Sequence, residues 1–214
     1  MNSRHSLPSV MSLVAWTAFS GALGAVASLA TGCDTHADTH AASPSSASTA
    51  EPKDIPASSL ALTSSAYAPG SSMPAKYTCE GGDTSPPLAW SGVPAGTKSL
   101  ALVVDDPDAP DPAAPTKVWV HWVVADIPPS VTGFAEGAAS SGLPAGAVAG
   151  TNDFGKATYG GPCPPIGRHR YFHELYALDA VLGVSAPTKA ALASAMNGHV
   201  LGKAELIATY QKAK

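Results

Sequence analysis

Short apolar runs with a two-residue period are spread along residues 60–210, and segments rich in Pro and Gly separate them. Residues 98–104 form one such run, with three aliphatic side chains on one face: Leu100, Leu102 and Val104. Residues 118–124 form the strongest, with Trp119, His121 and Val123 on one face and Val118, Val120, Trp122 and Val124 on the other. Successive side chains of a strand point to opposite faces of a sheet, so both runs predict β-strands.

Three further runs also predict strands: residues 60–63, residues 171–178 and residues 205–210. The run at 171–178 is apolar on both faces and is therefore expected at the centre of a sheet. One segment has a helical pattern instead. It spans residues 188–197, follows Pro187 and stops before Gly198, a residue type that ends helices.

The 20 prolines and 20 glycines among 214 residues imply many turns. Together with the strand pattern, they predict a mainly β domain over residues 59–214. We expect a two-sheet antiparallel β-sandwich with one or two short helices in the C-terminal half of the chain. Its longest connections, residues 105–117 and 150–169, are irregular, and loops of that length are commonly functional.

Residues 1–32 have the order of a lipoprotein-type signal peptide, with an uncharged apolar run from residue 10 to residue 30. The small residues before Cys33 predict lipid attachment at that cysteine. Residues 34–58 lack large apolar side chains and, with Cys33, predict a disordered tether. An uncleaved anchor helix or plain secretion are the alternatives. Lipidation, an anchor helix and secretion would all place the domain outside the cytoplasm. Lipidation at Cys33 predicts a lipoprotein anchored on the periplasmic side of a membrane.

The charge balance and the number of cysteines exclude some classes of function. Sixteen acidic residues outnumber twelve Lys and Arg, and the chain has no basic stripe, which argues against nucleic-acid binding. Cys79 and Cys163 remain as an even pair, either as a disulfide or as two buried thiols. The absence of a Cys-x-x-Cys motif argues against a zinc site, and we expect neither a metal nor a cofactor.

The segment 106–110 follows the run at 98–104 and holds two aspartates and two prolines. Proline restricts its own backbone and that of its predecessor, so this stiff loop suits Asp106 and Asp108 for fixed positions in a site. The alternative is a tight turn in which both carboxylates bind their own backbone. A cis peptide bond is compatible with this loop but is the minority form.

His121 stands within an apolar run, either as a core histidine with a partner or as a site residue. We expect Asp106 to be that partner and to raise the histidine pKa, which would make the ring a cationic donor to an anion.

Gly160 and Gly161 can bring backbone N–H groups close to a ligand. His169 and Tyr171, two residues apart, point the same way, while Arg170 points oppositely toward an ion pair or the surface. This residue set predicts a pocket for a small anion such as phosphate.

These motifs resemble the phosphatidylethanolamine-binding protein family, and more narrowly its bacterial Raf kinase inhibitor-like branch. The resemblance rests on residues 106–110, His121, Gly160-Gly161-Pro162 and residues 169–171. Four further segments are similar to the bacterial branch: residues 77–81, 85–88, 90–94 and 152–155. The match covers about residues 60–212.

The resemblance implies a β-sandwich with an anion-binding pocket at one end. It assigns ligand-binding positions to Asp106, Asp108, Ala109, Pro110, Trp119, His121, Gly161, Pro162, His169 and Tyr171. Gly161 would face the anion with its backbone. Eukaryotic members end in a longer helical tail beside the pocket, which has no counterpart after Tyr210.

We therefore expect a non-enzymatic protein that binds a phosphate, a phosphorylated small molecule or a phospholipid headgroup. One alternative is an extracytoplasmic inhibitor or regulator of a protease or kinase, with an unknown protein target. A metal-dependent phosphoester hydrolase is disfavoured, because the chain has no His-Glu-x-x-His, no Gly-x-Ser-x-Gly and no phosphate-loop motif.

Overall fold

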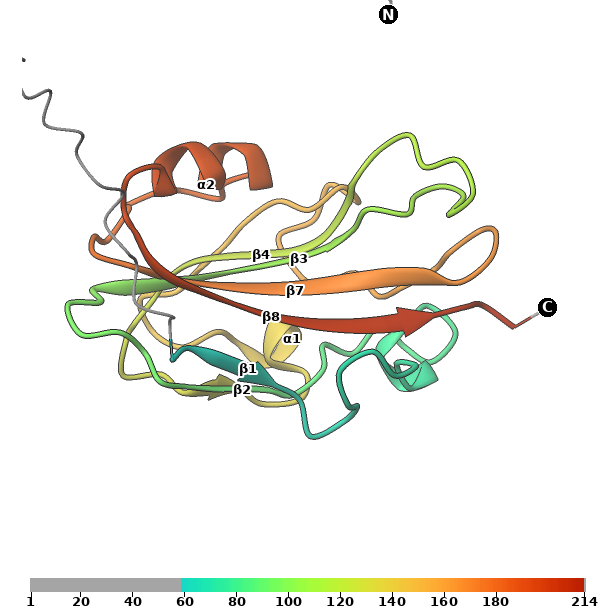
Figure 1. The fold of residues 1–214 in the computed structure, drawn as a ribbon, viewed down its shortest axis with the longest axis horizontal. Coiled ribbons are helices and arrows are strands. Elements are labelled where there is room, and N and C mark those ends of the chain that lie inside the picture. The colour runs from blue at the N-terminus through green and yellow to red at the C-terminus, as the bar shows by residue number, and fades with distance from the viewer. Residues whose placement is uncertain (1–58, 214) are drawn as a thin grey trace, which may run out of the picture. The chain divides into compact units, whose positions relative to one another are not determined.

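The computed structural model describes residues 59–213, which form an antiparallel β-sandwich (Figure 1). The expected segments at 1–32 and 33–58, including the lipid attachment at Cys33, lie outside the described residues. The large sheet has the order β6-β4-β3-β7-β8: β6 (Val148–Ala149), β4 (Trp119–Ile127), β3 (Ser99–Asp106), β7 (His169–Leu178) and β8 (Val200–Tyr210). The small sheet has the order β1-β2-β5: β1 (Ala61–Thr63), β2 (Leu88–Ser91) and β5 (Gly133–Phe134).

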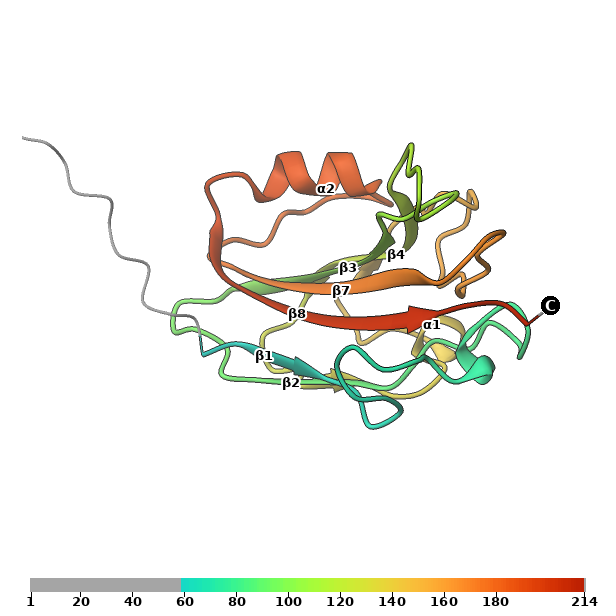
Figure 2. The ribbon, with the colours of Figure 1, turned by 45° about the vertical axis from the view of Figure 1, so that its right-hand side comes forward.

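The large sheet is buried on both faces, which explains the continuous apolar runs of its central strands. One face packs on the small sheet, and the other carries α2 (Lys189–Met196), as two views of the ribbon show (Figure 2). Leu192 and Met196 of α2 pack against Ala101, Val103 and Val123. The main core lies between the sheets, where Leu102, Val104, Trp122 and Val124 meet Leu62, Trp90 and Phe134.

The predicted fold class, strands and late helix are confirmed. The Thr188 side chain caps α2 by accepting the Ala191 N–H, and β8 starts five residues before the expected strand at 205–210. The sequence pattern did not predict β2, β5 or β6, and two of these contain only two residues, too few to show a period. The 3-10 helix η1 (Ala75–Tyr77) and the helix α1 (Ala138–Ser141) are likewise single turns.

A β-bulge in β4 corrects the predicted faces of that strand. Val104 pairs with Trp122 and Asp105 pairs with Val120, so His121 is an extra residue between the two pairs. Val120 and Val123 therefore both pack under α2, while Trp122 and Val124 lie in the main core. The predicted grouping of Val120 with Trp122, and of His121 with Val123, is wrong because strict alternation does not survive an inserted residue.

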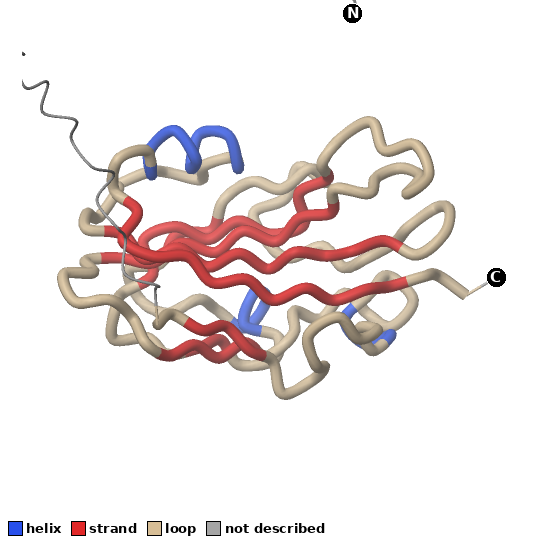
Figure 3. Tube along the Cα trace, in the orientation of Figure 1, coloured by secondary structure: helices blue, strands red, loops and turns tan. Residues whose placement is uncertain are grey.

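The bulge and the long connections lie at one end of the large sheet. The β3–β4 loop and the segment that leads into β7 extend from this end, where the tube drawing shows long loops beyond the strands (Figure 3). Within the β3–β4 loop, the Ala109–Pro110 peptide bond is cis. The candidate site lies among these loops.

Candidate functional site

A cavity of about 210 Å³ opens among the loops at this end of the sandwich. Most of the predicted site residues line it: Asp106, Ala109, Pro110, Trp119, His121, His169 and Tyr171. Asp108, Gly161 and Pro162 do not. Five lining residues were not among the predicted set: Lys117, Phe154, Cys163, Pro164 and Pro165. The structure therefore brings the distant acid, imidazole and phenol groups together at one cavity.

The carboxylate of Asp106 is paired with His169 rather than with His121. Its Oδ2 lies 2.7 Å from His169 Nδ1, and its Oδ1 accepts the N–H of Asp108 at 2.8 Å. The other ring nitrogen of His169 lies 2.9 Å from the carbonyl oxygen of Ile166. Both ring nitrogens of His169 are therefore engaged within the protein, which fixes the orientation of the ring.

His121 binds a backbone carbonyl instead of a carboxylate. Its Nδ1 lies 2.6 Å from the carbonyl oxygen of Gly160, which fixes the proton on Nδ1 and leaves Nε2 without a partner among residues 59–213. Burial lowers the pKa of His121, and the Gly160 carbonyl and the Asp106 charge offset only part of this shift. The expected Asp106–His121 pair and the expected rise in the pKa are therefore both corrected.

Tyr171 is buried, with 1% of its surface exposed, and lines the cavity between the two histidines. Its ring lies 5.2 Å from that of His121 and stacks at 6.5 Å on that of His169. Its hydroxyl has no hydrogen-bond partner within the described part of the chain. Burial raises the pKa of Tyr171, followed by the charge of Asp106 and a side-chain interaction with that carboxylate, which lies near the hydroxyl without a hydrogen bond of good geometry. The group therefore stays a neutral donor at physiological pH.

Asp108 and Arg170 form the ion pair that was expected of Arg170, outside the cavity. The guanidinium donates to both carboxylate oxygens, with distances of 2.9 Å from Nε and 2.7 Å from an Nη, and the Arg170 backbone N–H donates to Asp108 as well. These bonds lower the pKa of Asp108, chiefly through the side chain of Arg170. Asp108 is thus a residue that ties the β3–β4 loop to β7, and it does not line the cavity.

The Gly160-Gly161 pair has a packing role that the sequence did not indicate. The N–H of Gly160 donates to the carbonyl of His121, and that of Gly161 donates to Oδ1 of Asp83, both at 3.0 Å. A Cβ at Gly160 would lie 2.6 Å from the Phe154 ring, and one at Gly161 would lie 2.5 Å from Asp83 Oδ1. The expected role of Gly161 as a backbone donor to an anion is corrected, because its N–H is already bound within the protein.

Phe154 forms part of the apolar wall of the cavity. Its ring makes edge contacts with Trp119 at 5.3 Å and with His121 at 5.6 Å. Asn152 shapes this loop by accepting the Phe154 and Lys156 N–H groups and donating to the His121 carbonyl. The segment 152–155 was noticed in the sequence, but nothing local showed that it folds over the cavity.

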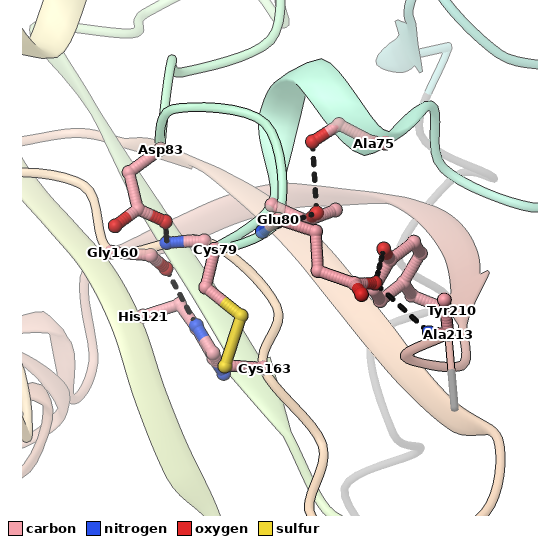
Figure 4. Close-up of a disulfide and its surroundings, with 11 residues drawn as sticks. Ala75, Cys79, Glu80, Asp83, His121, Gly160, Cys163, Tyr210 and Ala213 are labelled. Atoms are coloured by element: carbon pink, nitrogen blue, oxygen red, sulfur yellow. Dashed lines mark hydrogen bonds between the residues drawn. A yellow bond between two sulfur atoms is a disulfide. The ribbon is translucent and has the colours of Figure 1, made fainter.

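Cys79 and Cys163 form a disulfide with a Cα–Cα distance of 5.5 Å, which decides between the two alternatives for this pair (Figure 4). Cys163 lines the cavity, so the bridge is part of its wall. Within residues 59–213, no group of three or more His, Cys, Asp or Glu is arranged to hold a metal ion. In the same range, no helix combines the length and the apolar character needed to cross a membrane.

The sandwich, with its cavity of one acid, two histidines and a tyrosine, identifies the class of protein. A family model described as phosphatidylethanolamine-binding protein matches residues 63–211, and the chain belongs to this family. Within it, the chain falls in the bacterial branch that includes the UPF0098 proteins and YbcL.

Three relatives illustrate the match. A UPF0098 protein of Methanothermobacter thermautotrophicus is 53% identical over 142 residues, which cover 65% of this chain and 91% of that protein. The crystal structure of a phosphatidylethanolamine-binding protein homologue from Chlamydia trachomatis has a TM-score of 0.66 and 42% identity, with 73% of this chain and 100% of that chain covered. The corresponding values for E. coli YbcL are 0.66 and 37%, with 72% and 99% covered.

Proposed function

We propose that this protein binds a small oxyanion in the cavity, namely the phosphate of a phosphorylated small molecule or of a phospholipid headgroup. The observation that carries this proposal is Tyr171, a residue that lines the cavity and whose buried hydroxyl makes no geometric hydrogen bond among the described residues. A buried donor without a partner is unfavourable by about 1–3 kcal/mol, so a ligand oxygen that accepts from it would recover that energy.

His121 and Lys117 complete a donor set for an oxyanion, whereas both ring nitrogens of His169 are bound within the protein. Nε2 of His121 has no partner among residues 59–213 and lies on a ring that lines the cavity. When the ring takes up a proton, Nε2 becomes a donor and the cavity gains a positive charge. The exposed Lys117, whose Nζ lies 4.0 Å from the centre of the Trp119 ring, adds a cation to the lining. The name of the family refers to a phosphate-bearing lipid, which agrees with this chemistry.

We also propose that binding proceeds without chemical turnover, cofactor or metal. The residues that line the cavity include no serine, and the sulfur of Cys163 is held in the disulfide. Tyr171, the remaining hydroxyl, has a raised pKa and is therefore a poor nucleophile at neutral pH. A phosphatase assay on the purified protein tests this point, and turnover that Tyr171→Phe abolishes would contradict it.

The disulfide also supports the proposal that the domain works in an oxidising compartment, attached to a membrane through a lipid on Cys33. Mass spectrometry of the protein purified from membranes tests this. A mature chain that starts at a diacylated Cys33 is the expected result, and an unmodified chain in the soluble fraction contradicts it. Contact with a protein partner, in the manner of an inhibitor, remains the alternative use of the same fold.

The decisive experiment is calorimetric titration with phosphate and with sulfate, whose charge stays constant over the range used. Measurements at about pH 5.5 and about pH 8 lie on either side of the ordinary histidine pKa. Because the His121 pKa is lowered, the free protein holds this ring neutral at the higher pH, and an anion favours the protonated form. Sulfate affinity should therefore rise as the pH falls, by at most about tenfold per pH unit for one linked proton. Absence of binding for both anions, or equal sulfate affinity at both pH values, contradicts the proposal.

A further inference from the structure

Several bonds connect the wall of the cavity that contains His121 to a nearby turn. This turn does not itself line the cavity. We call residues 159–163 the wall segment and residues 77–83 the anchoring turn. Two hydrogen bonds to backbone carbonyls join them: the Tyr159 hydroxyl donates to the Tyr77 carbonyl at 2.8 Å, and the Cys79 N–H donates to the Pro162 carbonyl at 3.1 Å. Two side-chain links follow, the disulfide and the bond from the Gly161 N–H to Asp83. Figure 4 shows the last two beside His121.

Asp83 stands at the end of the anchoring turn in a conformation that aims its carboxylate at the wall. The carbonyl of Thr78 accepts the N–H groups of Gly81, Gly82 and Asp83 at 3.0, 3.2 and 3.1 Å. Asp83 itself has a φ of 54°, a left-handed conformation that aspartate and asparagine tolerate better than most residues. The turn thus presents one acceptor to the Gly161 N–H, the group that the missing Cβ of glycine leaves within reach.

The wall segment in turn holds His121. Gly160 and His121 exchange two hydrogen bonds: the Gly160 N–H donates to the His121 carbonyl at 3.0 Å, and His121 Nδ1 donates to the Gly160 carbonyl at 2.6 Å. The second bond decides which ring nitrogen carries the proton and which one remains for a ligand. A shift of the wall would therefore change the tautomer of His121 without any change in the residues that face the cavity.

We propose that Asp83 is a positioning residue for the anion-binding cavity, which acts with the Cys79–Cys163 bridge to hold the Gly160 carbonyl against His121 and so keeps Nε2 available to the ligand. This inference rests on the proposed function for its consequence in binding. Its structural half, the control of the His121 tautomer, stands independently of any ligand.

The variants separate the effect of the Gly161–Asp83 hydrogen bond from the effects of the Asp83 charge and of backbone strain at its positive φ. Asp83→Gly removes the acceptor at a backbone conformation that glycine adopts freely. Asp83→Asn keeps an acceptor oxygen and removes the charge. The double variant Cys79→Ala/Cys163→Ala removes the bridge without leaving either thiol. Glu80→Ala is the matched control, because Glu80 lies in the same turn but binds Tyr210 and the Ala213 N–H instead of the wall (Figure 4).

The first readout is the His121 tautomer in the ligand-free full chain, from ¹⁵N chemical shifts of the imidazole at neutral pH, and the second is sulfate affinity. Wild type, Asp83→Asn and Glu80→Ala should show a single tautomer protonated at Nδ1. Asp83→Gly and the double cysteine variant should show a mixture of tautomers. Their sulfate affinity should fall about 3- to 10-fold, the range of one hydrogen bond.

An unchanged tautomer in both Asp83→Gly and the double cysteine variant overturns the proposal, whatever their affinity. If one of these variants does not fold, the other decides the result. A mixed tautomer in Glu80→Ala also overturns it, because the effect would then belong to the turn in general. If wild type binds no sulfate, the proposed function fails, while the tautomer measurement still judges the role of Asp83.

Discussion

The hydroxyl of Tyr171 does not stabilise the fold through a hydrogen bond within the described residues. The ring of Tyr171 packs between His121 and His169. Most buried polar groups in proteins do have a partner, and this exception is the basis of the proposed anion site. His121 Nε2 has the same character. In contrast, Asp106, Asp108 and Gly161 all have their hydrogen bonds satisfied inside the protein.

Tyr171→Phe should therefore weaken sulfate binding by about 10- to 100-fold, the range for one hydrogen bond to a charged group. The free energy of unfolding should stay within about 0.5 kcal/mol of wild type or rise, because no protein partner is lost. Calorimetry and urea denaturation measure the two quantities. Tyr176→Phe is the matched control, since its hydroxyl binds Glu174 and does not line the cavity, so its sulfate affinity should not change. A large loss of stability in Tyr171→Phe would contradict this interpretation.

Among the elements, the bulged strand β4 has the greatest effect on the site. The inserted residue turns His121 toward the cavity while its neighbour Val120 faces α2, so a single strand supplies both a cavity-lining ring and a packed outer face. Helix α2 then covers that outer face, fixed by Leu192 and Met196 and by an ion pair between Lys189 and the buried Asp105. Helix α2 thus stabilises the outer face of the sheet without lining the cavity.

Truncation of the α2 contact should reduce stability alone. Leu192 is fully buried, so Leu192→Ala leaves a cavity between helix and sheet and should lower the free energy of unfolding by about 2–5 kcal/mol. Ser194→Ala, at an exposed position on the same helix, should change it by less than about 0.5 kcal/mol. Urea denaturation at neutral pH compares them. Equal stability of the two variants would show that α2 does not pack as described.

For the molecule as a whole, the buried histidines link stability to pH. His173 is fully buried, and its Nε2 lies 3.1 Å from the Tyr67 hydroxyl. Burial lowers its pKa to about 4 from the ordinary 6.5, and burial lowers the pKa of His121 as well. Between about pH 4 and pH 6.5 the unfolded chain binds a proton at His173 that the folded protein does not bind. The free energy of unfolding is therefore highest above about pH 6.5 and falls as the pH falls toward 4.

The expected loss from His173 alone is about 3 kcal/mol between pH 6.5 and pH 4, at 1.36 kcal/mol per pKa unit. His173→Gln removes this titration and keeps an amide for Tyr67. The variant should be less stable than wild type at pH 7, but its stability should depend less on pH over that range. Urea denaturation at a series of pH values measures both curves. Parallel curves for the two proteins would contradict the assignment to His173.

The sequence sufficed for the fold class because its signals are local. The alternation at 98–104, the long run at 118–124 and the capped segment at 188–197 each contain their own period, and all three became the expected elements. The order and spacing of the motifs around Asp106, His121, His169 and Tyr171 likewise indicated a shared cavity, which the structure contains. The short strands β5 and β6 had no such signal, since two residues show no period.

The amino-acid sequence by itself thus determined most of the strands, but not β2, β5 and β6, and it also determined which family the chain resembles and which residue types gather at the site. Only the tertiary structure decided the partners: His169 for Asp106, the Gly160 carbonyl for His121, Asp83 for the Gly161 N–H, and Cys163 for Cys79. The physical reason is the separation along the chain over which each effect acts. Propensity and periodicity act over a few neighbouring residues, whereas a hydrogen bond between residues 40 or 80 apart depends on a bulge, a turn and a loop that are all in place at once.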